Sequence, residues 1–579
     1  MSIAVFLFSR DLSLSGIGKD TILAISNRLQ PQNVAYPSPQ LHIESGSLTA
    51  IINPVPSLLV DGPNLCLGGF YGEHNDWQAL NTSPPDGSYA LFRREGDSVE
   101  MLTDHLGARC IWYFFNDDIL IASNSQRAIT VLLRSFEPDT SNYPWMLSAG
   151  TLNFMHAWDV RVKRLPLRSR FSLDRATWQP QVSSYDSPHS PQTMDPVQAE
   201  RELALSVQQS VRSMNIDPKQ WFFALSGGYD SRSILLSLER PEAINTITWG
   251  TDSKKDLPMS DAYIAGELSA RFKTQHCYKE LRSIEEVEDI ETVLDLFIKN
   301  SEGQLDNLAG YTDGFSLWKD IFDSDRFGIV RGDEALADAE NPLQWSTAYQ
   351  EWGFMRLDEV PGLGGLDKSI QSMPQTLAPE LMRNGQESLT AYGQRLCEQY
   401  YVSMVVAPLN YMKTHYCEIL APLLSRRVIE AHHALPEALR TNKKAFTQMV
   451  ESQLPNFPIA TRTALQPKSE VFSSVALKTV LIDLLKAKRS KNNLPEGVLE
   501  ELLEYIEQVD STGFHARWKR LSWRLARRIR KMLDIRDFSI SPTRLALRLY
   551  IVIRIHEIFC EDAQLLGTAA KPELHSHTP

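Results

Sequence analysis

Short apolar runs separated by turn-forming residues dominate the first part of the chain. Six runs rich in aliphatic and aromatic side chains begin near residues 3, 48, 87, 98, 110 and 118, and Asp, Asn, Gly and Pro lie between them. Runs of this length bounded by turn formers predict β-strands. We therefore expect a domain of antiparallel sheet over residues 1–180.

A different pattern begins at residue 197. Leu203, Val207 and Val211 recur at a spacing of four, which predicts one apolar face of a helix. Short apolar runs typical of buried parallel strands follow, with a helical segment among them: strands at 221–225, 243–249 and 327–330, and a helix at 261–272. This β-α-β order predicts a doubly wound α/β sheet. From about residue 377 onward the chain is expected to be mostly helical.

Residues 181–196 lie between the two patterns. They contain three prolines and four serines and show no apolar period. Such composition is typical of an interdomain linker. We expect one domain over residues 1–180 and a second over residues 197–579.

Composition excludes several classes of protein. With 43% hydrophobic and 22% charged residues among 579, the chain is neither fibrous nor wholly disordered. A net charge of −12 argues against a protein that coats nucleic acid. The six cysteines form no C-x-x-C pair, so we expect reduced thiols and a cytoplasmic protein. No segment approaches the ~20 apolar residues of a membrane span, and the apolar N-terminal run is too short for a signal peptide.

The candidate chemistry centres on residues 225–232, LSGGYDSR, between a predicted buried strand and a helix-like run. Two glycines permit a tight turn close to a ligand, and free N–H groups at the start of a helix bind anions. The carboxylate of Asp230 suits a phosphate only where a cation such as Mg²⁺ lies between them. The loop is therefore predicted to hold pyrophosphate with a metal, the alternative being a plain strand-to-helix turn.

The SGGYDS segment resembles the SGGxDS loop of the PP-loop ATP pyrophosphatases, which cleave ATP between the α and β phosphates and adenylate a carboxylate. The Walker pattern is absent. Later segments resemble, in the same order, the synthetase domain of class B asparagine synthetases: TWG at 248–250, RGDE at 331–334, CEILAPLL at 417–424 and RTNK at 440–443. The resemblance implies a PP-loop synthetase domain with a doubly wound parallel sheet and a helical C-terminal part.

The resemblance also implies the site residues. Those expected to contact ATP are Leu225, Ser226, Gly227, Gly228, Asp230, Ser231, Trp249 and Gly332. Asp230 and Asp333 would share Mg²⁺. Lys443 would stabilise the negative charge at the α-phosphate, and Glu334 would orient or deprotonate the attacking amine.

Four further positions bear on this resemblance. Lys444 competes with Lys443, which we prefer because Phe446 and Val450 then fall on one helix face. Glu418 is expected to be a buried structural partner of a basic residue. The sequence departs from the family at Leu420, where the family has arginine, and at Ser425, where it has aspartate. These departures weaken free aspartate as the substrate.

The N-terminal part resembles the glutaminase domain of the same family, an Ntn-hydrolase-like (class II glutaminase-like) β-sandwich. The segments concerned are GSYA at 87–90, TDHLGAR at 103–109 and IASN at 121–124. That domain uses a cysteine exposed after Met1 is removed, whereas this chain has Ser2, a much weaker nucleophile. We expect an inactive glutaminase-like domain and an amine supplied by the substrate.

A synthetase domain behind a disabled glutaminase domain is the arrangement of β-lactam synthetases and lasso-peptide cyclases. The chain resembles the cyclases better, through its compact RGDE loop, its divergent P-x-L segment and its long helical C-terminal part. The implied reaction is ATP-dependent closure of a macrolactam between an Asp or Glu side chain and the N-terminal amine of a leaderless core peptide. A leader peptidase and a leader-recognition protein are the implied partners. A small-molecule ligase, for ammonia-dependent asparagine synthesis or β-lactam closure, and a pseudoenzyme scaffold remain alternatives.

A basic segment lies near the C-terminus. Residues 514–554 contain twelve Lys and Arg against two Asp, and 517–531 predict an amphipathic basic helix. We favour a solvated face that pairs with acidic residues of the same chain. Docking of an acidic partner or precursor peptide and loose membrane-surface contact are the alternatives, with nucleic acid last.

Overall fold

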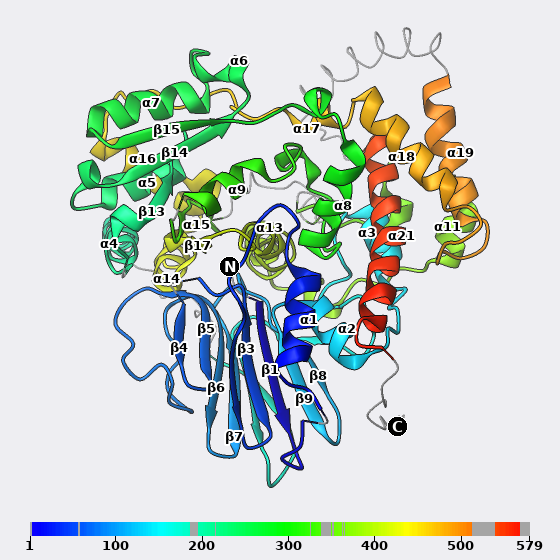
Figure 1. Cartoon of the computed structure of the whole chain (residues 1–579). Helices are drawn as coiled ribbons and strands as arrows, with labels where there is room; N and C mark the ends of the chain where they lie inside the picture. Colours follow the sequence, from blue (N-terminus) through cyan, green and yellow to red (C-terminus); the bar gives the residue numbers. More distant parts are fainter. Residues whose placement is uncertain are drawn as a thin grey trace.

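The computed structural model describes residues 3–14, 16–55, 58–185, 195–214, 216–324, 326–336, 349, 352–361, 363, 365–511 and 539–567. The chain is a mixed α/β protein (Figure 1). Two six-stranded antiparallel sheets form its N-terminal part, and a five-stranded parallel sheet with helices follows. The mixed α/β class and the change from antiparallel to parallel sheet agree with the two hydrophobic patterns.

The antiparallel sheets contain every strand predicted before residue 125. The first sheet has the order β10(Lys163–Arg164), β8(Trp112–Phe115), β9(Ile119–Ser123), β1(Ile3–Ser9), β3(Ser47–Ile52) and β2(Gln40–Glu44). The second has the order β12(Gln181–Ser184), β11(Ser169–Asp174), β7(Ser98–Thr103), β6(Gly87–Glu95), β5(Asn64–Phe70) and β4(Leu59–Asp61). Because β12 pairs with β11, the segment predicted as a linker from residue 181 begins inside this sheet. Residues 186–194 lie outside the described part of the chain.

Strand β1 is buried on both faces, which explains its uninterrupted apolar sequence. Its even-numbered residues pack toward the second sheet, where the rings of Phe6 and Phe92 lie 5.8 Å apart. Its odd-numbered residues pack with α1(Lys19–Leu29) and α2(Gln126–Leu133). The N-terminal part thus has two sheets face to face with helices on the outer face of the first.

The parallel sheet has the order β15(Gln275–Glu280), β14(Asn245–Gly250), β13(Trp221–Ala224), β16(Gly328–Val330) and β17(Glu418–Leu420). The chain adds β14 and β15 on one side of β13, then returns to add β16 and β17 on the other. In open α/β sheets, ligands bind beyond the carboxyl ends of the strands where the order reverses. In this sheet the reversal lies between β13 and β16.

The helices around this sheet include α4(Pro196–Arg212), α5(Tyr229–Ser237), α7(Asp261–Phe272) and α16(Lys444–Gln453) (Figure 1). Strands β13, β14 and β16 and helices α4 and α7 confirm the predictions made for them. Strands β15 and β17 were not predicted. β15 has a polar edge sequence, QHCYKE, and β17 has only three residues, so neither shows an apolar period.

Helix α21(Pro542–Gln564) packs against helices from both parts of the molecule (Figure 1). Near its start, Arg544 and Arg548 form ion pairs with Asp306 at 2.7 and 2.5 Å. Near its end, buried Asp562 pairs with Arg127 of α2 at 2.7 Å. Arg544 and Arg548, which belong to the basic segment, therefore pair with an acidic residue of the same chain. The predicted basic helix at 517–531 lies outside the described residues. Among the described helices, none has the length and apolar character that crossing a membrane requires.

Candidate functional site

The loop at 225–232 joins β13 to the N-terminus of α5. The hydroxyls of Ser226 and Ser231 lie 3.0 Å apart, and the backbone N–H of Ser226 donates to Ser231 Oγ at 3.0 Å. Gly227 is packed so closely that an added Cβ would lie 2.3 Å from the Cβ of Ala460. Side-chain hydrogen bonds and close packing thus hold the loop in shape at the start of a helix, where N–H groups favour an anion.

The segment RGDE at 331–334 directly follows β16 and touches this loop. A Cβ added to Gly332 would lie 2.9 Å from the backbone N of Ser231 and 3.0 Å from the Cβ of Asp230. Any larger residue would push the two segments apart, because the nearest neighbours include backbone atoms. The glycine therefore permits Asp333 and Glu334 to lie beside the loop at the point where the strand order reverses.

Lys443 connects these two segments. Its Nζ lies 3.3 Å from Oδ1 of Asp230 and 2.5 Å from Oε1 of Glu334. Asn442 and Lys443 have φ angles of 55° and 51°, a left-handed backbone that costs non-glycine residues roughly 1–3 kcal/mol each. This turn ends at α16 and directs Lys443 inward, while Lys444 is exposed. Of the two candidate lysines, Lys443 is the one that the structure brings to the loop.

The charges of this cluster are strongly coupled. Burial raises the pKa of Glu334 to about 7, against the opposing effect of Lys443. Burial alone would lower the pKa of Lys443, but Glu334 and Asp230 outweigh it and raise that pKa above its ordinary value. Lys443 therefore stays charged, while Glu334 exchanges its proton near neutral pH, as an efficient general base does.

Asp333 has partners that the sequence did not reveal. Its carboxylate lies 3.1 Å from Arg331 and accepts a hydrogen bond from Asn410 at 3.3 Å. Burial opposes its ionisation, but Arg331 and Lys413 outweigh burial and lower the pKa of Asp333 to about 2. Burial also lowers the pKa of Lys413 to about 7. Asp333 is thus an ionised carboxylate held in place by a cation and an amide.

The carboxylates are compatible with magnesium bound together with a nucleotide. Among the described residues, no group of three or more His, Cys, Asp or Glu could hold a metal on its own. Mg²⁺ is commonly held by one or two carboxylates, with phosphate oxygens and water completing its shell. The side chain of Asp230 is 37% exposed and that of Asp333 17%, so both could reach a ligand at this edge.

Trp249 lies at the same edge, near the end of β14. The hydroxyl of the preceding Thr248 donates to the carbonyl of Leu225 and so ties β14 to the start of the loop. The indole ring contacts Trp318, at 5.9 Å between ring centres, and the guanidinium of Arg331, at 5.7 Å. A half-buried aromatic surface at the carboxyl edge is suited to contact with a planar base.

Arg462 is a further residue that the sequence analysis missed. The segment that contains Arg462 runs beside the loop, because the backbone N–H of Ala460 donates to the carbonyl of Gly227 at 3.1 Å. The carbonyl of Arg462 itself accepts a hydrogen bond from the backbone N–H of Asp261 at 2.9 Å. The Arg462 side chain is exposed and forms no ion pair with any other described residue. An arginine in this position could bind a phosphate group. No local pattern marks it, because only the fold brings residues 460–464 to this edge.

Glu418 is the buried structural partner that we predicted. It forms an ion pair with Arg109 of the N-terminal part, which also donates to the carbonyl of Ile419 at 2.7 Å. Asp104 accepts hydrogen bonds from the backbone N–H groups of Leu106, Ala108 and Arg109 at 2.9 to 3.1 Å and so shapes the loop that presents Arg109. The segment at 103–109 thus forms a contact between the two parts of the molecule.

Asn124, in the segment at 121–124, accepts a hydrogen bond from the backbone N–H of Ala4 at 2.8 Å. The cavity beside it, which Arg109 and Tyr411 also line, measures about 20 Å³. That volume admits about one water molecule. Ser2, the residue at the expected nucleophile position, lies outside the described part of the chain.

The chain matches no protein-family model, and no curated protein matches its sequence. Fold alone does not establish function. The inference of function therefore depends on the chemistry of this site.

Proposed function

We propose that the chain is an ATP-dependent, AMP-forming amide ligase of the asparagine synthetase-like PP-loop group, most like a lasso-peptide cyclase. It adenylates an Asp or Glu side chain of a leaderless core peptide and joins it to the peptide's N-terminal amine as a macrolactam. One observation carries this proposal: the Ser226–Ser231 loop, Asp333, Glu334 and Lys443 meet where the order of the parallel strands reverses.

ATP would lie along this edge. The N–H groups at the start of α5, together with Ser226 and Ser231, would bind the pyrophosphate, and Trp249 and Gly332 would border the rest of the nucleotide. Asp230 and Asp333 would hold Mg²⁺, which supplies neutralising charge to the phosphates when bound. Arg462 adds a cation on the side of the loop toward α7.

Lys443 and Glu334 have separate roles in this scheme. The permanently charged Lys443 stabilises the negative charge that gathers at the α-phosphate. The peptide amine then attacks the acyl carbon: the new C–N bond forms, the C–O bond to the phosphate breaks, and AMP leaves. The proton lost by the amine passes to the carboxylate of Glu334, whose pKa of about 7 suits both its uptake and its release.

The N-terminal part supports an amine that comes from the peptide itself. Its motif residues Asp104, Arg109 and Asn124 are engaged in internal hydrogen bonds and an ion pair. The cavity of about 20 Å³ beside Asn124 offers no room for glutamine. Holding the amine and the activated carboxyl together in one site would replace a diffusional encounter.

The proposal is tested by exchange of labelled pyrophosphate into ATP. Purified protein with Mg²⁺ receives either free aspartate or a leaderless peptide that bears an internal Asp or Glu. We expect pyrophosphate exchange with the peptide, and we expect Asp230→Ala to abolish it. Asp320→Ala is the control and should retain exchange, because it removes an exposed carboxylate that pairs with Lys279. Exchange with aspartate alone would replace the peptide by a small-molecule substrate. Absence of exchange with both substrates would contradict adenylation.

A further inference from the structure

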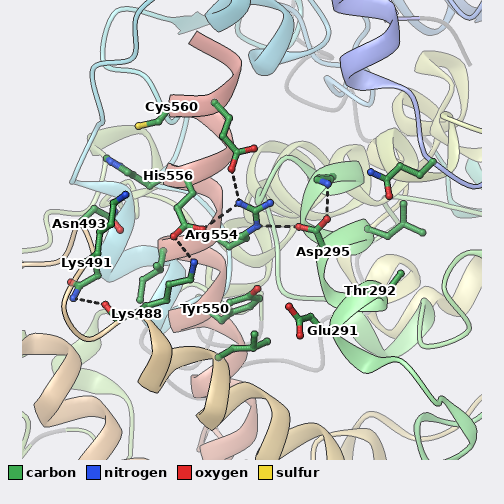
Figure 2. A pocket seen from close by; sticks show the side chains of 18 of the residues that line it. Glu291, Thr292, Asp295, Lys488, Lys491, Asn493, Tyr550, Arg554, His556 and Cys560 are labelled. Carbon is green, nitrogen blue, oxygen red and sulfur yellow. Dashed lines mark hydrogen bonds and ion pairs between the residues drawn. The ribbon is translucent and has the colours of Figure 1, made fainter. Parts of the chain in front are cut away.

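A large cavity, of about 1380 Å³, lies apart from the candidate site and from the small cavity beside Asn124. Its walls come from α8(Ile290–Ser301), from α18(Val475–Ala487) and the residues after it, from α21 and from residues 32–33 (Figure 2). No residue of the candidate ligase site lines it. Sites for single small molecules usually measure about 300–1,000 Å³, so this cleft is large enough for a longer ligand.

Most of the residues that line the cleft are charged or polar, and their charges are nearly balanced. Five carboxylates and four Lys or Arg side chains line it. A polyanion would need an excess of cations, which this cleft does not have. Five side-chain amides also line the cleft: Gln32, Asn33, Asn492, Asn493 and Gln564. Each amide offers both donors and an acceptor, as an extended peptide backbone requires.

Ion pairs fix the centre of the cleft. Arg554 contacts Asp295, Glu557 and Glu561 at 3.0, 3.3 and 3.1 Å. Lys488 contacts Glu557 at 2.7 Å and so ties the segment after α18 to α21 (Figure 2). These groups satisfy one another, which leaves recognition to the side chains around them.

Three charged groups of the lining form no ion pair with a described residue, and one of them, Asp289, instead accepts hydrogen bonds from Thr292 at 2.6 and 2.9 Å. Glu291 and Lys491 form no ion pair with any other described residue, and they lie on opposite sides of Tyr550 in Figure 2. Oδ1 of Asn493 and Nδ1 of His556 are buried without a hydrogen-bond partner among the described residues. The cleft therefore presents an unpaired negative group, Glu291, and an unpaired positive group, Lys491, on a fixed frame.

We infer that this cleft binds an extended peptide segment of another molecule, with opposite charges toward its two ends. Glu291 meets the positive end, Lys491 meets the negative end, and the amides hold the backbone between them. Helix α8 packs against α13(Ala407–Lys413), whose Asn410 contacts Asp333. A peptide held in the cleft thus lies one helix away from the candidate ligase site. Binding there requires no ATP and does not depend on the proposed function.

The test uses three fluorescent peptides of equal length and full-length protein without ATP. One peptide carries Lys near one end and Glu near the other, one carries Lys at both ends, and one carries Glu at both. We expect the mixed peptide to bind about threefold more tightly than the others, as one added exposed ion pair allows. Equal binding of all three would overturn the proposal.

Variants make the test specific to the cleft. Lys491→Glu and Glu291→Lys each abolish the preference for the mixed peptide, and the double variant, which again has one charge of each sign, restores it. Lys486→Glu is the matched control, because Lys486 pairs with Glu507 and does not line the cleft. A preference that survives Lys491→Glu, or a double variant that fails to restore it, would contradict the proposed contacts.

Cys560 provides a readout at the site itself. It is half-buried and lines the cleft, whereas Cys277, on β15, is similarly half-buried and does not. The mixed peptide is expected to lower the alkylation rate of Cys560 in proportion to the fraction of protein that is bound. The alkylation rate of Cys277 should not change; peptide mass spectrometry measures both rates. Binding without protection of Cys560 would place the peptide elsewhere and overturn the proposal.

Discussion

Two regions of this chain carry motif-like polar residues, and the structure uses them differently. In the N-terminal part, Asp104, Arg109 and Asn124 are at most 6% exposed and hold internal contacts. At the edge of the parallel sheet, the side chains of Asp230 and Lys443 are 37% and 16% exposed and lie beside a helix N-terminus. Similarity of a motif therefore says little until the exposure of its polar side chains is known.

The largest expected effect tests the structural role of the first region. Arg109→Ala leaves Glu418 buried without its cation, which should lower the free energy of unfolding by about 3–5 kcal/mol. Chemical denaturation measures this loss. Arg240→Ala, which removes a surface ion pair, is the control and should change stability by less than about 0.5 kcal/mol. A loss below about 1 kcal/mol for Arg109→Ala would deny the motif its structural role.

The second prediction tests the chemical role of the other region. Lys443→Ala should lower AMP formation about 10²–10³-fold, because it removes the charge held beside Asp230 and Glu334. Lys444→Ala, one residue along the same turn but exposed, should leave the rate unchanged. Equal losses in both variants would show that the turn, rather than the Lys443 ammonium, matters.

A third prediction concerns the contact between the two loops of the site. Gly332→Ala forces a Cβ to within 2.9 Å of backbone N of Ser231, so the loops must separate. Misplacement on this scale should lower pyrophosphate exchange about 10²-fold. Gly310→Ala is the control, since a Cβ there would meet nothing within 4 Å. Full exchange activity in Gly332→Ala would contradict the close approach.

A fourth prediction concerns pH. Since burial raises the pKa of Glu334 to about 7, the rate of amide formation should rise with pH below 7 and level off above it. Glu334→Gln should slow amide formation about 10²-fold and abolish this dependence, yet retain pyrophosphate exchange. Because the folded pKa exceeds the unfolded one, the stability contribution of Glu334 is present at low pH and lost as the pH rises through about 7. An unchanged pH profile in the variant would exclude Glu334 as the base.

The smallest expected effect concerns the N-terminal part. Ser2→Ala should leave ligase activity unchanged, and added glutamine should not stimulate the wild-type protein. Glutamate release and AMP formation, measured together, provide the check. If the wild-type protein hydrolysed glutamine and Ser2→Ala abolished that activity, the N-terminal part would be a working glutaminase, which would contradict the account.

The sequence predicted the elements that have a strong local periodicity, and it predicted the 225–232 loop from its SGGYDS segment. Helix α7 begins and ends at the predicted residues, and the 225–232 loop joins a buried strand to a helix as expected. The sequence did not predict that Arg331 and Asn410 hold Asp333, or that the segment with Arg462 runs beside the loop. Asn410 and Arg462 reach the site from far along the chain, and no local period records such contacts.

The central claim is that a peptide carboxylate is joined to AMP at this site. The most direct measurement supplies a peptide whose Asp or Glu carboxylate is labelled with ¹⁸O, together with ATP, and follows the label by mass spectrometry. Adenylation predicts that one labelled oxygen appears in AMP as the lactam forms, because the carboxyl C–O bond breaks when AMP leaves. Lactam formation with unlabelled AMP, or with labelled inorganic phosphate and ADP, would contradict the account.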